Sequence, residues 1–198
     1  MEGIRIERLQ GEALRARLPD LARLRIEVFR DYPYLYDGSQ DYEEEYLRTY
    51  AEAPGSVIVG AFDGGTLVGA ATALPLEHET GNLLEPFRAR NLDVPRIFYF
   101  GESVLLKPWR GRGIGAAFFD QREAAALAPG RFTHACFCAV VRPPDHPRRP
   151  PGYRPLDDFW RRRGYAPVPG LTCEFSWRDL DEERDSPKPM QFWMKELV

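Results

Sequence analysis

The sequence is poor in cysteine and histidine, and it has no long apolar run. Its three cysteines, Cys136, Cys138 and Cys173, are too few and too odd in number for a disulfide framework, so we expect reduced thiols. No stretch is long and apolar enough to act as a signal peptide or to cross a bilayer. These absences predict a cytoplasmic protein without a membrane partner.

Metal ions and nucleic acids are both disfavoured as partners. The Cys-x-Cys pair at positions 136 and 138 has no nearby histidine, and the histidines are scattered along the chain, so a zinc site is not expected. The formal net charge is -3, whereas nucleic-acid binders usually carry a basic stripe or a basic domain. We therefore expect no metal and no nucleic-acid partner.

Length and composition are those of an ordinary globular domain. The 198 residues include 43% hydrophobic and 29% charged residues, with no shift in composition and no internal repeat. A chain of this length can bury a substantial core in one unit. We therefore expect a single domain over residues 1–198.

Apolar spacing and turn residues predict a mixture of helices and strands. Leucines at helical spacing predict a helix across residues 13–29, interrupted at Pro19, and the sequence Asp63-Gly64-Gly65 predicts a hairpin. Residues 142–155 should form a loop because prolines recur through them. Further helices are predicted at residues 40–53, 83–90, 113–128 and 156–163. Strands are predicted at residues 4–9, 56–62, 66–74, 96–106, 131–141, 165–168, 171–177 and 190–197.

A glycine-rich turn at residues 110–116 joins an apolar strand to an alanine-rich helix. Its glycines, Gly111, Gly113 and Gly115, allow a tight turn and a close approach of the backbone to a ligand. The first amides of a helix have no intrahelical acceptor, and together with the helix dipole they favour an anion. Arg110 and Arg112 can add charge-assisted contacts to phosphate oxygens. The turn therefore predicts a pyrophosphate site.

The spacing of this turn separates it from other nucleotide-binding designs. It is not GxGxxG, no acidic residue follows at the dinucleotide distance, and GxxxxGK[ST] does not occur, so Rossmann and P-loop sites are disfavoured. Arg110, Gly113 and Gly115 instead match Arg-x-x-Gly-x-Gly, and the turn resembles the acyl-CoA signature of the GNAT superfamily of N-acyltransferases. The alternative is a plain connection between a strand and a helix.

A second segment extends this resemblance. Residues 158–165 are similar to a recurrent GNAT segment, commonly Phe-Tyr-x-x-x-Gly-Phe, and the order of predicted elements is similar to the GNAT core over nearly the whole chain. The resemblance implies a mixed α/β fold with a central, mostly antiparallel, splayed sheet flanked by helices. It also implies acetyl-CoA as the co-substrate, no required metal, and a possible homodimer.

The resemblance further implies where acetyl-CoA binds. The pantetheine arm would pair with Val104, Leu105 and Leu106, as a short extra strand would. Phe159 and Arg162 are candidates for its distal end, although packing and surface roles explain these two almost as well. The pyrophosphate would lie on the turn, against the amides of Gly111, Arg112, Gly113, Ile114, Gly115 and Ala116, beside Arg110.

Acyl transfer to an amine requires removal of a proton from the ammonium, and Glu102 is the candidate base. Strand alternation predicts that its side chain shares a face with Phe98, Phe100 and Val104, and apolar surroundings favour a neutral carboxyl group. The alternative is a structural glutamate. The family commonly uses a tyrosine as the acid, but the matching residue is Trp160, whose indole cannot protonate a thiolate. This leaves Tyr153, Tyr99, or no dedicated acid.

The acceptor is the least determined part of the site. Tyr34 and Tyr36, in a tyrosine-rich loop at residues 31–38 (the tyrosine loop), are candidates to contact it, and Arg142 is a candidate for an acceptor carboxylate. Acidic and aromatic groups suit an amine, so a small-molecule primary amine is the leading prediction. The alternatives are acetylation of a protein N-terminus or lysine, and a CoA-binding sensor or interaction module that has lost turnover.

Overall fold

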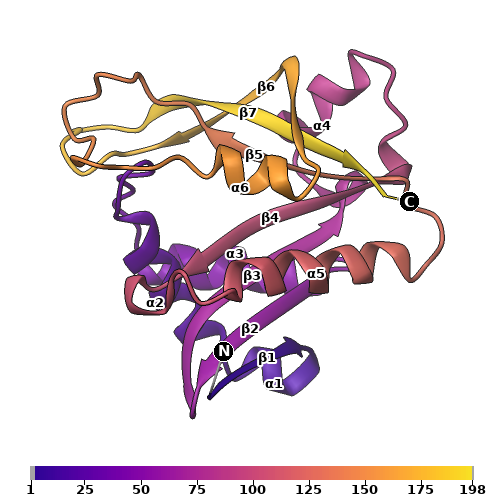
Figure 1. Ribbon diagram of the computed structural model, residues 1–198, viewed down its shortest axis with the longest axis horizontal. Coiled ribbons are helices and arrows are strands. Elements are labelled where there is room, and N and C mark those ends of the chain that lie inside the picture. The colour runs from indigo at the N-terminus through magenta and orange to yellow at the C-terminus, as the bar shows by residue number, and fades with distance from the viewer. Residues whose placement is uncertain (1–2, 198) are drawn as a thin grey trace.

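The computed structural model describes residues 3–197, without the side chains of residues 49–51, and its centre is an open sheet (Figure 1). Within the described residues, seven strands follow the order β1-β2-β3-β4-β5-β7-β6. Every neighbouring pair is antiparallel except β4 and β5, so the expectation of a mostly antiparallel sheet is confirmed. The strands are β1 (Ile4–Leu9), β2 (Val57–Asp63), β3 (Thr66–Pro75), β4 (Ile97–Leu105), β5 (His134–Val140), β6 (Ala166–Trp177) and β7 (Ser186–Glu196).

Helices cover both faces of the sheet, with α5 and α6 on one face and α2, α3 and α4 on the other (Figure 1). The predicted interruption at Pro19 is confirmed, because the proline occupies the first turn of α2 and a separate α1 precedes it. The helices are α1 (Gly11–Arg15), α2 (Leu18–Phe29), α3 (Gln40–Glu52), α4 (Gly81–Arg88), α5 (Ile114–Leu127) and α6 (Asp157–Arg162). Short 3-10 helices are η1 (Leu76–His78), η2 (Val94–Arg96) and η3 (Lys107–Trp109).

The two strands predicted at residues 165–168 and 171–177 belong to one strand, β6. Its pairing with β7 shifts between Pro167 and Thr172. Pro167 and Pro169 have no backbone N–H to donate, and Gly170 has a positive φ of 66°, so the ladder is interrupted without ending the strand.

The sheet is splayed where β4 and β5 meet. These strands pair only through Ile97 to Tyr99 and His134 to Cys136. Beyond that point β4 continues along β3 as far as Leu105, whereas β5 continues along β7 to Val140. The two halves of the sheet therefore separate, as Figure 1 shows, and the β5-facing edge of β4 is open after Tyr99.

A β-bulge in β4 changes which face its side chains occupy. Ala71 pairs with Ser103 but Ala73 pairs with Phe100, so Gly101 and Glu102 together oppose Thr72. Phe98 and Phe100 pack beneath α5, whereas Val104 packs beneath α2. The prediction that Glu102 shares a face with Phe98 and Phe100 is therefore wrong, because simple alternation fails across a bulge.

Buried Arg122 of α5 supports this bulge from the opposite face. Its guanidinium donates hydrogen bonds to the carbonyls of Thr72 and Glu102, at 3.2 and 3.1 Å, and to Ser103 Oγ at 2.8 Å. The guanidinium carbon also lies 4.3 Å from the centre of the Phe100 ring. Carbonyls left unpaired at the irregularity thereby acquire donors, which a buried backbone group requires.

We expect Arg122→Met to lower the free energy of unfolding by about 2–3 kcal/mol, because the buried carbonyls of Thr72 and Glu102 lose their donors. Urea unfolding followed by circular dichroism measures this change. Arg88→Met on α4 is the control, since Arg88 is exposed and, among the described residues, forms an ion pair only with Glu85 one turn away, so its change should stay within about 0.5 kcal/mol. Equal effects of the two substitutions would contradict this role of Arg122.

Candidate functional site

The glycine turn has the backbone geometry of an open helix N-terminus. Gly111 and Gly113 have positive φ values of 76° and 81°, and Gly113 is the N-cap residue immediately before α5. No side chain caps this end of α5, and its first turn contains no acidic residue. The first amides of α5 therefore point outward without an internal anion to satisfy them.

The two arginines of the turn, Arg110 and Arg112, differ in their hydrogen bonds and ion pairs. Arg110 Nε donates to the carbonyl of Leu105 at 2.9 Å, and its guanidinium lies 3.9 Å from Asp31. Lys107 also binds Asp31, at 2.8 Å, so the tyrosine loop is tied to the turn. Arg112 is exposed and has no hydrogen bond or ion pair within residues 3–197. Arg110 thus holds the turn in place, while Arg112 is available to a bound anion.

Helix α6 carries two further predicted residues, and one of them, Phe159, borders the turn. A Cβ built on Gly115 would lie 3.9 Å from Phe159 Cζ, so Phe159 borders the start of α5. The Phe159 ring also packs edge-on against Phe119, 5.6 Å between centres. Arg162, one turn further along α6, is exposed and has no hydrogen bond or ion pair in the described part of the chain. The packing role and the predicted ligand role are therefore compatible for Phe159.

Beside the open edge of β4, two carboxylates share one buried arginine. Arg25 of α2 contacts Glu102 at 2.5 Å and donates through Nε to Glu43 of α3. The Glu102 side chain is 7% exposed and that of Glu43 is fully buried. The apolar surroundings predicted for Glu102 are therefore wrong, since its carboxylate forms an ion pair. With both carboxylates ionised, the triad carries one excess negative charge.

Buried tyrosine hydroxyls lie on this face of the sheet, and those of Tyr46 and Tyr34 interact with Glu102. Tyr46 OH lies 3.5 Å from Glu102 Oε2, and Tyr99 OH lies 3.2 Å from Cys138 Sγ. Burial raises the pKa of Tyr34, and the neighbouring Cys138, Tyr153 and Glu102 raise it further. These hydroxyls therefore remain protonated at neutral pH and can donate hydrogen bonds into the site.

The proline-rich loop brings Tyr153 to the tyrosine loop. The Tyr153 ring packs edge-on against Tyr32, 4.7 Å between centres, and the Arg149 guanidinium lies 5.3 Å from it. Burial raises the pKa of Tyr153, as does Tyr32. Tyr36 hydrogen-bonds Glu43, and its pKa is raised by burial and then by Glu43. Of these predicted residues, Tyr34 interacts with both Glu102 and Tyr153, and Tyr36 interacts with Glu43.

Glu79, after η1, was not among the residues predicted from the sequence. Burial raises its pKa to about 7, against the effect of a hydrogen bond from the Thr80 amide, and the charge of Glu102 raises it further. The charge of Glu79 in turn raises the pKa values of Tyr46, Tyr99 and Cys136. Glu79 therefore belongs to the same acidic cluster, although no sequence pattern marks it.

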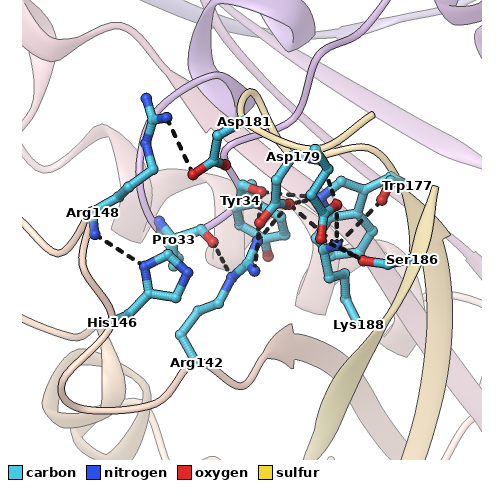
Figure 2. A network of polar contacts seen from close by, with 11 residues as sticks. Pro33, Tyr34, Arg142, His146, Arg148, Trp177, Asp179, Asp181, Ser186 and Lys188 are labelled. Carbon is cyan, nitrogen blue, oxygen red and sulfur yellow. Dashed lines mark hydrogen bonds and ion pairs between the residues drawn. The ribbon is translucent and has the colours of Figure 1, made fainter. Parts of the chain in front are cut away.

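Arg142 is engaged inside the protein (Figure 2). Its guanidinium donates to both oxygens of Asp179, at 2.7 and 2.9 Å, and to the carbonyls of Pro33 and Tyr34, at 2.7 and 2.8 Å. The side chains of Arg142 and Asp179 are 8% and 6% exposed. Lys188 lies 3.5 Å from Asp179 and 2.7 Å from Glu182. Arg142 thus joins the end of β5 to the tyrosine loop and the β6–β7 hairpin, in place of the predicted contact with an acceptor.

Trp160, at the position where the family commonly has a tyrosine, is partly buried and packs against the core. Its ring centre lies 5.0 Å from both Phe137 and Trp193. Nothing in this packing places a proton donor at that position. Within residues 3–197, no group of three His, Cys, Asp or Glu residues is arranged to hold a metal ion, and no helix is long and apolar enough to cross a membrane.

Comparison with known proteins supports the resemblance seen in the motifs. The sequence profile of the acetyltransferase (GNAT) family matches residues 21–150. No sequence among the curated proteins matches this chain.

Solved structures share the fold at low sequence identity. An acetyltransferase from Acinetobacter baylyi has a TM-score of 0.64 at 11% identity, covering 100% of this chain and 94% of its own. A ribosomal-protein-alanine N-acetyltransferase from Brucella melitensis has a TM-score of 0.63 at 14% identity, covering 98% and 99%. An acetyltransferase from Salmonella typhimurium, solved with its cofactor acetyl-CoA, has a TM-score of 0.60 at 8% identity, covering 100% and 95%. At these identities the similarity establishes the fold.

We expect Asp179→Asn to lower the free energy of unfolding by about 3–5 kcal/mol, because Arg142 and Lys188 lose a buried counter-charge. Chemical unfolding measures the loss. Asp181→Asn on the same hairpin is the matched control: Asp181 is 54% exposed and lies 3.6 Å from Arg148, so its substitution should change stability by less than about 1 kcal/mol. An unchanged midpoint for Asp179→Asn would reject the structural role of the network.

Proposed function

The chain belongs to the GNAT family of acetyltransferases, and we propose that it moves the acetyl group of acetyl-CoA to a small primary amine by direct attack in a ternary complex. The observation that carries this proposal is the juxtaposition of an uncapped helix N-terminus, an open strand edge and a buried acidic cluster at one split in the sheet.

The turn and the open edge of β4 suit acetyl-CoA. Beyond Tyr99, β5 leaves this edge of β4 unpaired, and the backbone of Val104, Leu105 and Leu106 is assigned to the pantetheine arm. The Leu105 carbonyl also accepts from Arg110, and the Leu106 amide donates to Val68. Arg112 and Arg162 supply exposed positive charge for phosphates. The pyrophosphate is assigned to the amides of Gly111, Arg112, Gly113, Ile114, Gly115 and Ala116.

The acidic cluster suits a cationic acceptor. Arg25 balances one of its two carboxylate partners, so an incoming ammonium would compensate the remaining charge. The hydroxyl of Tyr34 and the ring of Tyr153 would line the path of the amine. Because Arg142 is bound to Asp179, we exclude it from the acceptor site and propose an amine without an adjacent carboxylate.

The reaction needs little beyond positioning and proton transfer. Acetyl-CoA supplies an activated thioester with a good leaving group. The chain must hold the amine against it, accept a proton from the ammonium, and return one to the departing sulfur. Tyr34 and Tyr153 are the proposed donors, since both hydroxyls stay protonated.

We expect Gly111→Ala to weaken acetyl-CoA binding about tenfold, measured by isothermal titration calorimetry, because a Cβ strains the turn and faces the anion. Gly130→Ala is the matched control. Gly130 also has a positive φ, 69° against 76°, and open space around its Cα, but it lies at the far end of α5. Similar losses of affinity in both variants would indicate strain alone and reject the assignment of the turn.

The central experiment follows release of the CoA thiol with acetyl-CoA and a panel of amines. Tyramine and tyrosine differ only by a carboxylate, and we expect kcat/KM to be at least about tenfold higher for tyramine, because the cluster repels an anion. Faster reaction of tyrosine would contradict the acceptor assignment.

A peptide with a free N-terminus, if preferred to every small amine, would indicate a protein acceptor. Binding without turnover would favour a sensor, and no binding would end the proposal.

A further inference from the structure

The carboxylates of Glu79 and Glu102 lie in one cluster but have different partners. Glu102 is paired with Arg25 at 2.5 Å. Glu79 accepts a hydrogen bond from the Thr80 amide at 3.3 Å, and it has no ion-pair partner within residues 3–197. A guanidinium competes with any proton for a carboxylate, whereas a single amide competes far less. The two groups are therefore suited to different tasks.

Glu79 is placed where β4 and β5 part. It follows η1, which continues from the end of β3, where Leu74 pairs with Tyr99. The residues with which it interacts electrostatically come from three elements: Tyr46 from α3, Tyr99 and Glu102 from β4, and Cys136 from β5. Tyr99 and Cys136 form the last residue pair before the strands diverge. Glu79 therefore lies at the vertex of the split, on the face that carries Glu102.

From this placement we infer that Glu79 takes the proton from the acceptor ammonium, while Glu102, held by Arg25, attracts and positions that ammonium; the inference rests on the proposed function. Near neutral pH Glu79 exchanges its proton readily, since its pKa is about 7, raised by burial and by Glu102. Two carboxylates that lie close together but have different binding partners commonly divide such roles.

The proton and electron balance is simple. One N–H bond of the ammonium breaks and an O–H bond forms on Glu79. The freed amine attacks the thioester carbonyl, a C–N bond forms, and the C–S bond breaks with its electron pair on sulfur. The second proton on nitrogen passes to that sulfur, directly or through a tyrosine hydroxyl. Glu79 then returns its proton to water.

The test is the pH dependence of kcat with tyramine. In the wild-type protein kcat should rise with pH through about 7, because Glu79 must be ionised to accept a proton. Glu79→Gln should lower kcat about 100-fold or more at pH 8 and abolish this rise of kcat with pH. Glu102→Gln should raise KM. It should also move the rise of kcat to lower pH, because the charge that raises the pKa of Glu79 is lost. A structural role would predict neither shift.

Glu77→Gln is the matched control. Glu77 lies two residues from Glu79 but pairs with Arg131 at 2.8 Å, so its substitution should leave kcat and its rise with pH unchanged. Suppose that wild type turns over and that Glu79→Gln keeps both the rise of kcat with pH and a kcat within about twofold of wild type. The inference is then wrong and the proposed function stands.

A measurement without turnover separates the two claims further. The side-chain carboxyl ¹³C resonance of Glu79, assigned by its loss in Glu79→Gln, should titrate near pH 7 in the intact protein, and at lower pH in Glu102→Gln. Titration near the ordinary value of about 4.3 would overturn the inference whatever the amine panel gives. Wild-type protein that releases no thiol with any amine would instead overturn the proposed function.

Discussion

The contact of Arg122 with the bulge in β4 is the interaction on which the site depends. Without the extra residue at Gly101 and Glu102, Glu102 would face α5, among Phe98 and Phe100. The bulge turns it toward Arg25 and the tyrosines, and Arg122 binds the carbonyls that the irregular ladder leaves unpaired. One buried cation on one face of the sheet thus stabilises the backbone that presents a carboxylate on the other.

Much of the fold could be predicted because its signals are local. The hairpin at Asp63-Gly64-Gly65, the interruption at Pro19 and the glycine turn each depend on the backbone preferences of two or three adjacent residues. The family resemblance of the turn was also supported by a second segment, residues 158–165, at the expected separation along the chain. The splayed, mostly antiparallel sheet followed from the family resemblance, and the strand pairing confirms it.

The chemistry of the cluster could be predicted less well, because it is assembled from residues distant in the chain. Strand alternation does not predict a bulge. Nothing in the sequence near Arg142 indicates that it binds Asp179, which is 37 residues away in the chain. The sequence gives a weak indication that Arg25 is buried, because this charged residue lies among the apolar positions Leu21, Leu24 and Val28 of α2. No sequence pattern marks Glu79, since its raised pKa comes from burial and from Glu102, which is distant in the chain.

The split between β4 and β5 passes through the sheet, and this separates two routes. The turn that suits acetyl-CoA leads into α5 on one face, whereas the carboxylates and tyrosines lie beneath α2 and α3 on the other (Figure 1). On the proposed function, the two substrates would approach from opposite sides and meet in the middle. Neither product would then obstruct the exit of the other, and the enzyme would need no large opening motion between turnovers.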